Sequence, residues 1–246
     1  MEIVTAHKNG KLIQDKKSIF STSSAYDCPV TGTIYGCILN EQQSLNKKLD
    51  SFSEKPYQTP PKAPILYLKP ENTKNGHQSQ VAVPEKATKV SIGGTLGIII
   101  GKTATQVSVE KALDFIGGYT IVSDVSLPHD SFFRPAVKYR SLDGFTPAGP
   151  WIVSKETIAD PNKLNIRTKI NDDTVLHFNT GNLVRSVEQL LSDITEFMTL
   201  CPGDCLLVGN GLDLPLAGVG DHIEVHIDEI GFLQHSISLE KKGDSL

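Results

Sequence analysis

Asp124, Arg134, Arg140 and Lys69 have side chains that could bind or transform a small acid. Asp124 falls at the end of an apolar segment, where a carboxylate can ligate a hard cation or equally cap a loop. The three cations lie near prolines, and guanidinium and ammonium groups hold carboxylates through charge-assisted hydrogen bonds. Taken singly, such cations are usually solvated surface residues. These residues therefore indicate a candidate dicarboxylate site without fixing its chemistry.

A second group of polar residues alternates along a short apolar segment. His222, Glu224 and His226 would share one face of a strand, so a metal site there is one interpretation. The other is the solvated face of an antiparallel strand whose intervening Ile223 and Val225 face the core. We favour the second, because it explains both halves of the alternation.

Other motifs give little support for further chemistry. Residues 97–103 resemble a phosphate-binding loop, but Leu96 stands where that loop requires its first glycine. A core strand ending near residue 101 is the better interpretation. Cys201 and Cys205 have no second cysteine or histidine pair for zinc. The sequence has no G-x-S-x-G elbow, so a serine hydrolase of that type is not supported.

Hydrophobic periodicity predicts many strands and few helices, which is typical of a β-dominated α+β fold. A helix is expected over residues 182–198, with Asn182 as its N-cap and Val187, Leu190 and Ile194 buried. Residues 109–116 have helical spacing, and residues 41–55 are either a helix or a loop. Residues 164–178 resemble a hairpin. Further strands are expected at residues 33–39, 65–68, 96–100, 119–125, 205–208, 223–227 and 232–239.

The composition describes an ordinary globular chain. It has 246 residues, 39% hydrophobic and 21% charged, with a formal net charge of −4. No overall basic field would attract nucleic acid or an anionic membrane. No apolar run approaches the length of a spanning helix, and the N-terminus lacks the pattern of a signal peptide. We therefore expect a cytoplasmic protein with reduced cysteines. We expect residues 1–31 to be an N-terminal arm and residues 32–242 the folded domain.

Several segments, in order, resemble the fumarylacetoacetate hydrolase family. They are Leu68-Lys69-Pro70, Ile98-Ile99-Ile100-Gly101-Lys102, Ile116-Gly117-Gly118-Tyr119-Thr120 with Ser123-Asp124-Val125-Ser126, Arg140-Ser141-Leu142-Asp143-Gly144-Phe145, and Pro202-Gly203-Asp204. The resemblance covers roughly residues 33–240. It implies a mixed β-sandwich or roll with few helices, and an oligomeric enzyme acting on small dicarboxylate or tricarboxylate 2-oxo acids. The segment from Ser126 to Ala136 is most similar to the isomerase/decarboxylase members that act in aromatic catabolism.

The resemblance also implies a metal site that this chain only partly keeps. Active family members bind magnesium or manganese through a Glu-x-Glu pair and the aspartate of an Asn-Asp-Val block. The metal stabilises the enolate of a 2-oxo acid. Asp124 matches the aspartate, but Gly93 and Thr95 stand at the two glutamate positions. We therefore expect that the chain does not hold a divalent metal tightly.

Further departures from the family pattern affect proton transfer. Ser44 stands where many members carry a lid histidine, and the lid glutamate position falls near Lys47. Arg140 replaces the family lysine, which keeps the charge but not a titratable amine. Residues 209–211 replace a Gly-Thr-Pro turn.

These departures leave three hypotheses open. The chain is a non-catalytic or weakly catalytic subunit that pairs with a metal-bearing homologue. Alternatively, it is a metal-independent lyase, isomerase or hydrolase that uses Lys69, Asp124, Arg134 and Arg140. As a third possibility, it binds a dicarboxylate without chemistry.

Overall fold

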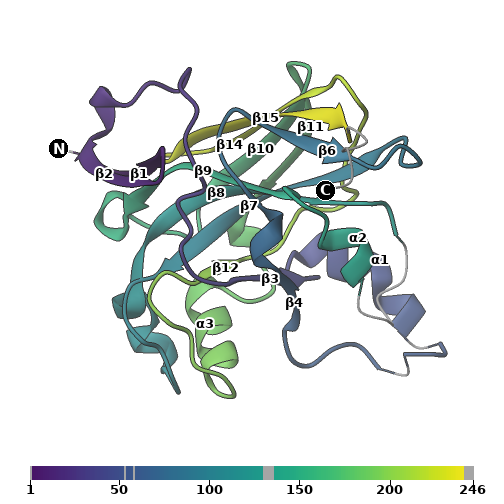
Figure 1. The fold of residues 1–246 in the computed structure, drawn as a ribbon. Helices are drawn as coiled ribbons and strands as arrows, with labels where there is room; N and C mark the ends of the chain where they lie inside the picture. The colour runs from purple at the N-terminus through teal and green to yellow at the C-terminus, as the bar shows by residue number, and fades with distance from the viewer. Residues whose placement is uncertain (1, 53, 58, 130–135, 241–246) are drawn as a thin grey trace.

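Two β-sheets, one packed on the other, form the body of the protein (Figure 1). The computed structural model describes residues 2–52, 54–57, 59–129 and 136–240. Over these residues strands greatly outnumber helices. The expected β-dominated α+β fold with mixed sheets is therefore confirmed.

The larger sheet contains ten strands within the described residues. They are β1 (Ile3–Lys8), β2 (Lys11–Lys16), β3 (Ile34–Ile38), β4 (Ile65–Lys69), β5 (Lys74–Asn75), β7 (Val90–Ile100), β8 (Ile116–Ser126), β9 (Thr146–Ser154), β12 (Cys205–Leu207) and β13 (Leu216–Ala217). Their order is β2-β1-β9-β8-β7-β12-β3-β4, with β13 paired to β7 and β5 to β9.

The smaller sheet has five strands in the described part of the chain, in the order β11-β10-β14-β15-β6. They are β6 (Ser79–Val83), β10 (Asn165–Ile170), β11 (Asp173–Asn179), β14 (His222–Ile227) and β15 (Gly231–Leu239). Strands β10, β14 and β15 contact β7, β8 and β9 of the larger sheet. The predicted hairpin of residues 164–178 is confirmed as β10–β11.

Strands β7 and β8 form the centre of the core. They pair antiparallel from Ser91 opposite Ser126 to Ile100 opposite Ile116, and almost all of their side chains are buried. Burial on both faces explains why this part of the sequence is apolar without alternation. Gly94 has a steric role, because a Cβ there would lie 2.5 Å from the Thr168 hydroxyl of β10. The glycine allows the two sheets to approach.

The α-helices are α1 (Gln42–Phe52), α2 (Val137–Arg140) and α3 (Val187–Thr195) among the described residues. Short 3-10 helices are η1 (Lys17–Ile19), η2 (Glu71–Thr73), η3 (Val109–Phe115), η4 (Lys155–Thr157) and η5 (Thr180–Asn182). Helix α1 settles the choice left open for residues 41–55. The helical spacing of residues 109–116 corresponds to 3-10 rather than α geometry. None of the described helices has the length and apolarity needed to cross a membrane.

Helix α3 begins later than its sequence predicted. The prediction of Asn182 as N-cap is wrong, because Asn182 ends the 3-10 turn η5. Ser186 is the cap, and its side-chain oxygen accepts a hydrogen bond from the Gln189 backbone N–H. The apolar face was predicted correctly. Val187, Leu190 and Ile194 are all fully buried.

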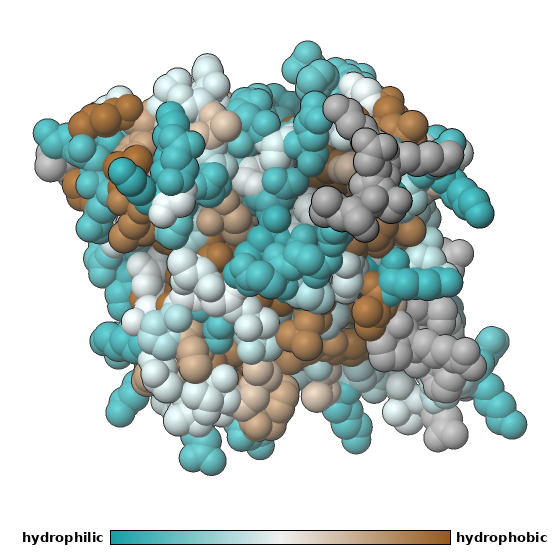
Figure 2. All heavy atoms as spheres, viewed as in Figure 1, coloured by the Kyte–Doolittle hydropathy of each residue, from teal (hydrophilic) through white to brown (hydrophobic). Residues whose placement is uncertain are grey.

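The segment expected as an N-terminal arm contains regular structure that its polar sequence did not indicate. Strands β1 and β2 form a hairpin, and β1 pairs with β9 at Val4 and Thr5. Val4 is buried in the core, whereas Leu12 is 65% and Ile19 63% exposed. Figure 2 shows apolar side chains at the upper left, where Figure 1 places this hairpin. Part of residues 1–31 therefore extends the larger sheet.

The alternating residues of β14 form one buried apolar face and one polar face at the surface, as the strand interpretation predicted. Ile223, Val225 and Ile227 are buried, whereas Glu224 is partly exposed. Glu224 forms an ion pair with Lys169 of β10 at 3.0 Å. The polar face of this strand therefore faces solvent rather than converging on a metal.

The burial of α3 gives a test of the core. Leu190→Ala should lower the free energy of unfolding by about 2–5 kcal/mol, because it removes a fully buried side chain and leaves a cavity. Phe197→Ala, at a position 65% exposed just beyond the helix, should change it by less than about 1 kcal/mol. Urea unfolding followed by circular dichroism measures both. Equal losses in the two variants would contradict the packing of α3.

Candidate functional site

A buried carboxylate surrounded by cations is the centre of the candidate site. Asp124, near the end of β8, is 1% exposed. Its Oδ1 lies 3.0 Å from the Lys69 ammonium. Its Oδ2 accepts hydrogen bonds from Arg140 Nη1 at 2.7 Å and from the Tyr67 hydroxyl at 2.5 Å. Asn210 Nδ2 lies 3.3 Å from the same oxygen. The two cations and one carboxylate give this cluster a net charge of +1.

Strand β4 supplies two members of the cluster. Tyr67 and Lys69 are two residues apart, so both side chains project from the same face of the strand. Gly36 of β3 pairs with Tyr67, and a Cβ on Gly36 would lie 2.0 Å from the tyrosine ring. The glycine therefore leaves room for Tyr67 to extend across β3 to Asp124. Lys69 is fixed by two further hydrogen bonds, to the carbonyl oxygens of Val125 at 2.9 Å and Arg140 at 2.8 Å.

The surroundings of Asp124 and Tyr67 determine the protonation states of these two groups. Burial alone would raise the pKa of Asp124. Lys69, Arg140 and the hydrogen bond from Tyr67 lower it by more than burial raises it, so the pKa is about 2. Burial and the neighbouring Asp124 raise the pKa of Tyr67 well above its ordinary value. Asp124 therefore stays ionised at neutral pH, and Tyr67 stays a hydrogen-bond donor. The Arg140 guanidinium also lies over the Tyr67 ring, 4.4 Å from its centroid.

Gly93 and Thr95 are the positions that the resemblance matches to metal-binding glutamates, and their surroundings leave no room for such ligands. Gly93 pairs with Asp124, and a Cβ on Gly93 would lie 2.6–2.8 Å from the side-chain atoms of Asn210. The Asn210 carboxamide therefore occupies the space that a side chain at residue 93 would need. Thr95 is fully buried and donates its hydroxyl hydrogen to the Gly209 carbonyl at 2.6 Å. The Thr95 hydroxyl is therefore already used in a hydrogen bond inside the protein.

These donors do not fit a divalent cation. Asp124 is the one carboxylate in the cluster, and its oxygens already contact Lys69, Arg140 and Tyr67. Magnesium and manganese prefer several oxygen ligands, and nearby positive charges oppose their binding. Across the residues that the structure describes, no group of three or more His, Cys, Asp or Glu side chains is placed to hold a metal. The electrostatics of the cluster favour an anion.

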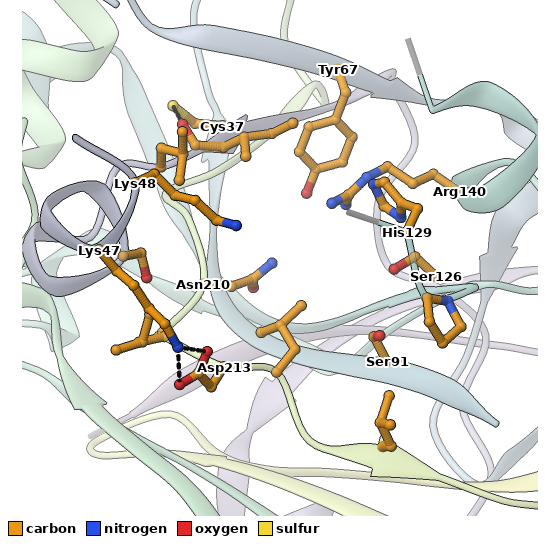
Figure 3. A pocket seen from close by; sticks show the side chains of 18 residues that line it. Cys37, Lys47, Lys48, Tyr67, Ser91, Ser126, His129, Arg140, Asn210 and Asp213 are labelled. Atoms are coloured by element: carbon orange, nitrogen blue, oxygen red, sulfur yellow. Dashed lines mark hydrogen bonds and ion pairs between the residues drawn. The ribbon is translucent and has the colours of Figure 1, made fainter. Parts of the chain in front are cut away.

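A cavity of about 450 Å³ opens beside this cluster (Figure 3). Tyr67, Arg140 and Asn210 line it next to Asp124, and α1 contributes Lys47 and Lys48. Figure 3 shows the Lys48 side chain extending into the cavity from the side opposite Arg140.

The rest of the cavity wall combines polar and apolar groups. Lys47 is paired with Asp213 at 2.7 Å, and both side chains are more than half exposed. Ser126 and His129 follow the end of β8 on another side. Apolar residues complete the lining and include Ile38, Leu39, Leu214 and Leu216.

The predicted substrate-binding residues have different places in this site. Arg140 lines the cavity. Lys69 is fully buried behind Asp124 and, like Asp124, is not among the residues that line the cavity. Arg134 lies outside the described residues. Ser44, which the resemblance matches to a lid histidine, and Lys47, near the expected lid glutamate, do line the cavity.

Sequence reasoning missed three residues of the site. Tyr67, His129 and the side-chain role of Asn210 were not predicted. A signal for Tyr67 was present: a tyrosine two residues before Lys69 shares its face. Nothing in the sequence placed Asn210 over Gly93, because the two residues are far apart along the chain.

Comparison with known proteins gives a consistent result. Residues 19–238 match the domain family described as "Fumarylacetoacetate (FAA) hydrolase C-terminal". The chain is 38% identical over 213 residues to the 4-hydroxyphenylacetate degradation bifunctional isomerase/decarboxylase of Escherichia coli, covering 86% of this chain and 48% of that protein. The chain thus spans about half the length of the bifunctional relatives it matches.

Solved structures share the fold. The 5-carboxymethyl-2-hydroxymuconate delta-isomerase of Mycobacterium smegmatis matches with a TM-score of 0.79 at 22% identity, covering 98% of this chain and 100% of that one. The maleylpyruvate hydrolase of Sphingobium sp. SYK-6, solved in complex with manganese(II) and pyruvate, matches with a TM-score of 0.72 at 25% identity. That match covers 94% of this chain and 78% of the hydrolase.

The buried charge cluster gives a direct test of the site's electrostatics. Asp124→Asn should lower the free energy of unfolding at pH 7 by about 3–5 kcal/mol, because it leaves two buried cations without their counter-ion. The difference in the free energy of unfolding between wild type and Asp124→Asn should become smaller as the pH falls from about 4 towards 2. A carboxylate with a depressed folded-state pKa stabilises the protein above its unfolded pKa, and this contribution is lost as the pH falls through the folded value.

Asp213→Asn is the matched control for this substitution. It breaks the exposed pair with Lys47, so the free energy of unfolding should change by no more than about 1 kcal/mol. Chemical denaturation at several pH values gives both quantities. A loss at Asp124 as small as that at Asp213 would show that the cluster is not held as described.

Proposed function

We propose that this chain, which belongs to the fumarylacetoacetate hydrolase family, is a subunit of an isomerase/decarboxylase of 4-hydroxyphenylacetate catabolism. The substrates of such an enzyme would be 5-oxopent-3-ene-1,2,5-tricarboxylate and 2-hydroxyhepta-2,4-dienedioate. The names of the bifunctional relatives support the pathway and the reaction class. We expect it to act as part of an oligomer in the cytoplasm.

The observation that carries the proposal is Arg140 on the wall of the cavity, in a buried cluster around Asp124 that has a net positive charge. A substrate of this class carries two or three carboxylates. Arg140 is held by Asp124 and by stacking on Tyr67, so its guanidinium is oriented before a ligand arrives. Preorganised cations bind a carboxylate with less loss of side-chain entropy. Lys48, on the opposite side of the cavity, is suited to a second carboxylate of the same ligand.

A degenerate metal site is part of the proposal. Asn210 over Gly93 and the internal hydrogen bond of Thr95 support it. The metal-dependent chemistry would then belong to a homologous chain that keeps the Glu-x-Glu pair. The 48% coverage of the bifunctional relatives is consistent with this arrangement, because their remaining length can contain a second domain of similar size.

A second candidate function is a metal-independent isomerase or lyase of the same family. The histidine His129 in the wall of a positively charged cavity favours it, because such a site can both bind an acid and accept a proton. Turnover by this chain alone, in the presence of a chelator, would distinguish it from a subunit that depends on its partner.

The degenerate metal site predicts weak magnesium binding. Calorimetric titration of the chain should show no saturable magnesium site in the micromolar range. The triple variant Gly93→Glu, Thr95→Glu and Asn210→Gly should bind magnesium more tightly than the double variant that retains Asn210. The reason is that the asparagine side chain occupies the space above residue 93. A tight stoichiometric magnesium site in the wild-type chain would contradict the proposal.

The subunit role predicts a heteromer. When the chain is mixed with a homologue that keeps the Glu-x-Glu pair, the two should elute together in size-exclusion chromatography. A permanent interface of this kind buries on the order of 2,000 Å² or more. The homologue should carry most of the turnover. Separate elution at micromolar concentration, with full activity of this chain alone, would leave the metal-independent enzyme as the better proposal.

A further inference from the structure

His129 is held in the cavity wall in one tautomer. Its Nδ1 lies 3.0 Å from the Leu127 carbonyl oxygen, which can only accept a hydrogen bond. Nδ1 of the neutral ring therefore carries the hydrogen, and Nε2 carries the basic lone pair. The ring stacks on Tyr139, with centroids 5.3 Å apart and planes 18° from parallel. The backbone supports this position, because the Leu127 N–H donates to the Tyr139 carbonyl at 2.8 Å.

The other ionisable groups lining the cavity are poor bases. Burial raises the pKa of the Cys37 thiol to about 12, and burial together with Asp124 keeps the Tyr67 phenol protonated. Lys47 is a cation and holds the Asp213 carboxylate in an ion pair. His129 is thus the group in the described cavity wall that can offer a nitrogen lone pair, at Nε2, to a proton of the substrate.

His129 and Arg140 also belong to the same local structure. Both follow β8, and Tyr139, on which His129 stacks, immediately precedes Arg140. Figure 3 shows both side chains on one side of the cavity, facing the space between them and Lys48. An acid held by Arg140 would therefore have its neighbouring carbon atoms close to the imidazole.

We propose that His129 is the general base of a metal-independent proton transfer on a 2-oxo acid bound in this cavity. Nε2 accepts a proton from the carbon next to the 2-oxo group, and the electron pair of that C–H bond forms the enolate double bond. Arg140 stabilises the enolate oxygen. The imidazolium then returns the proton, either to the same carbon or to the far end of a conjugated system, which yields the isomer. No oxidant or further reactant is needed.

This inference rests on the proposed carboxylate-binding function of the site and adds a chemical step to it. A histidine that served only to pack against Tyr139 would leave binding and exchange chemistry unchanged when replaced by a side chain of similar hydrogen bonding. Asparagine provides that replacement. Its amide N–H can take the place of Nδ1–H towards Leu127, while the basic nitrogen is lost.

The test uses 2-oxoadipate, a stable 2-oxo dicarboxylate, with a chelator present throughout. Calorimetry measures its binding, and proton NMR in D₂O measures exchange of its C3 hydrogens. The proteins are the wild-type chain, His129→Asn and the matched control His222→Asn, at an exposed histidine of β14 outside this cavity. His129→Asn should slow the protein-dependent exchange by roughly 100-fold or more, the usual contribution of a general base, while Kd changes by less than about threefold. His222→Asn should match the wild type.

Exchange retained in His129→Asn, or wild-type binding without any exchange, would overturn the role of His129 and leave the carboxylate-binding function standing. Absence of 2-oxoadipate binding to the wild-type chain would overturn both.

Discussion

A buried carboxylate that must be neutralised determines the design of this site. Asp124 is fully enclosed, and an isolated ionised group there would be strongly unfavourable. Lys69 and Arg140 provide the opposite charge, and Tyr67 adds a hydrogen bond. The cations are part of the protein, so the site is assembled when the chain folds and needs no metal for its charge balance.

The net charge of the cluster bears on what the cavity can recognise. Arg140 lines the cavity and Lys69 is buried behind it, so the excess positive charge favours an anion there. The guanidinium can still stabilise a developing enolate, although it gives less charge concentration than a divalent ion. Slower chemistry than at a site with a bound divalent cation is therefore expected.

The sequence predicted the fold better than it predicted the site. The apolar runs at residues 96–100 and 119–125 predicted the second half of β7 and most of β8, and the stripe on α3 identified its buried face. The start of α3 was missed because Asn182 and Ser186 are both residue types that cap helices well. Asn182 belongs to the 3-10 turn η5, so Ser186 caps the helix. The β1–β2 hairpin was missed because β2 is an exposed edge strand whose polar residues give no alternating signal. The contact of Asn210 with Gly93 depends on tertiary structure, which periodicity cannot reveal.

Gly93, Asn210 and the cations around Asp124 constrain one another. A glutamate at residue 93 alone would collide with Asn210 and would place a second carboxylate beside Asp124, where like charges repel. Removing Asn210 alone would open the space over Gly93 without supplying a ligand. Arg140 would also compete with any metal for Asp124, because it already holds Oδ2 at 2.7 Å. A divalent cation at this place would therefore require coordinated changes at residue 93, at Asn210 and among the cations around Asp124.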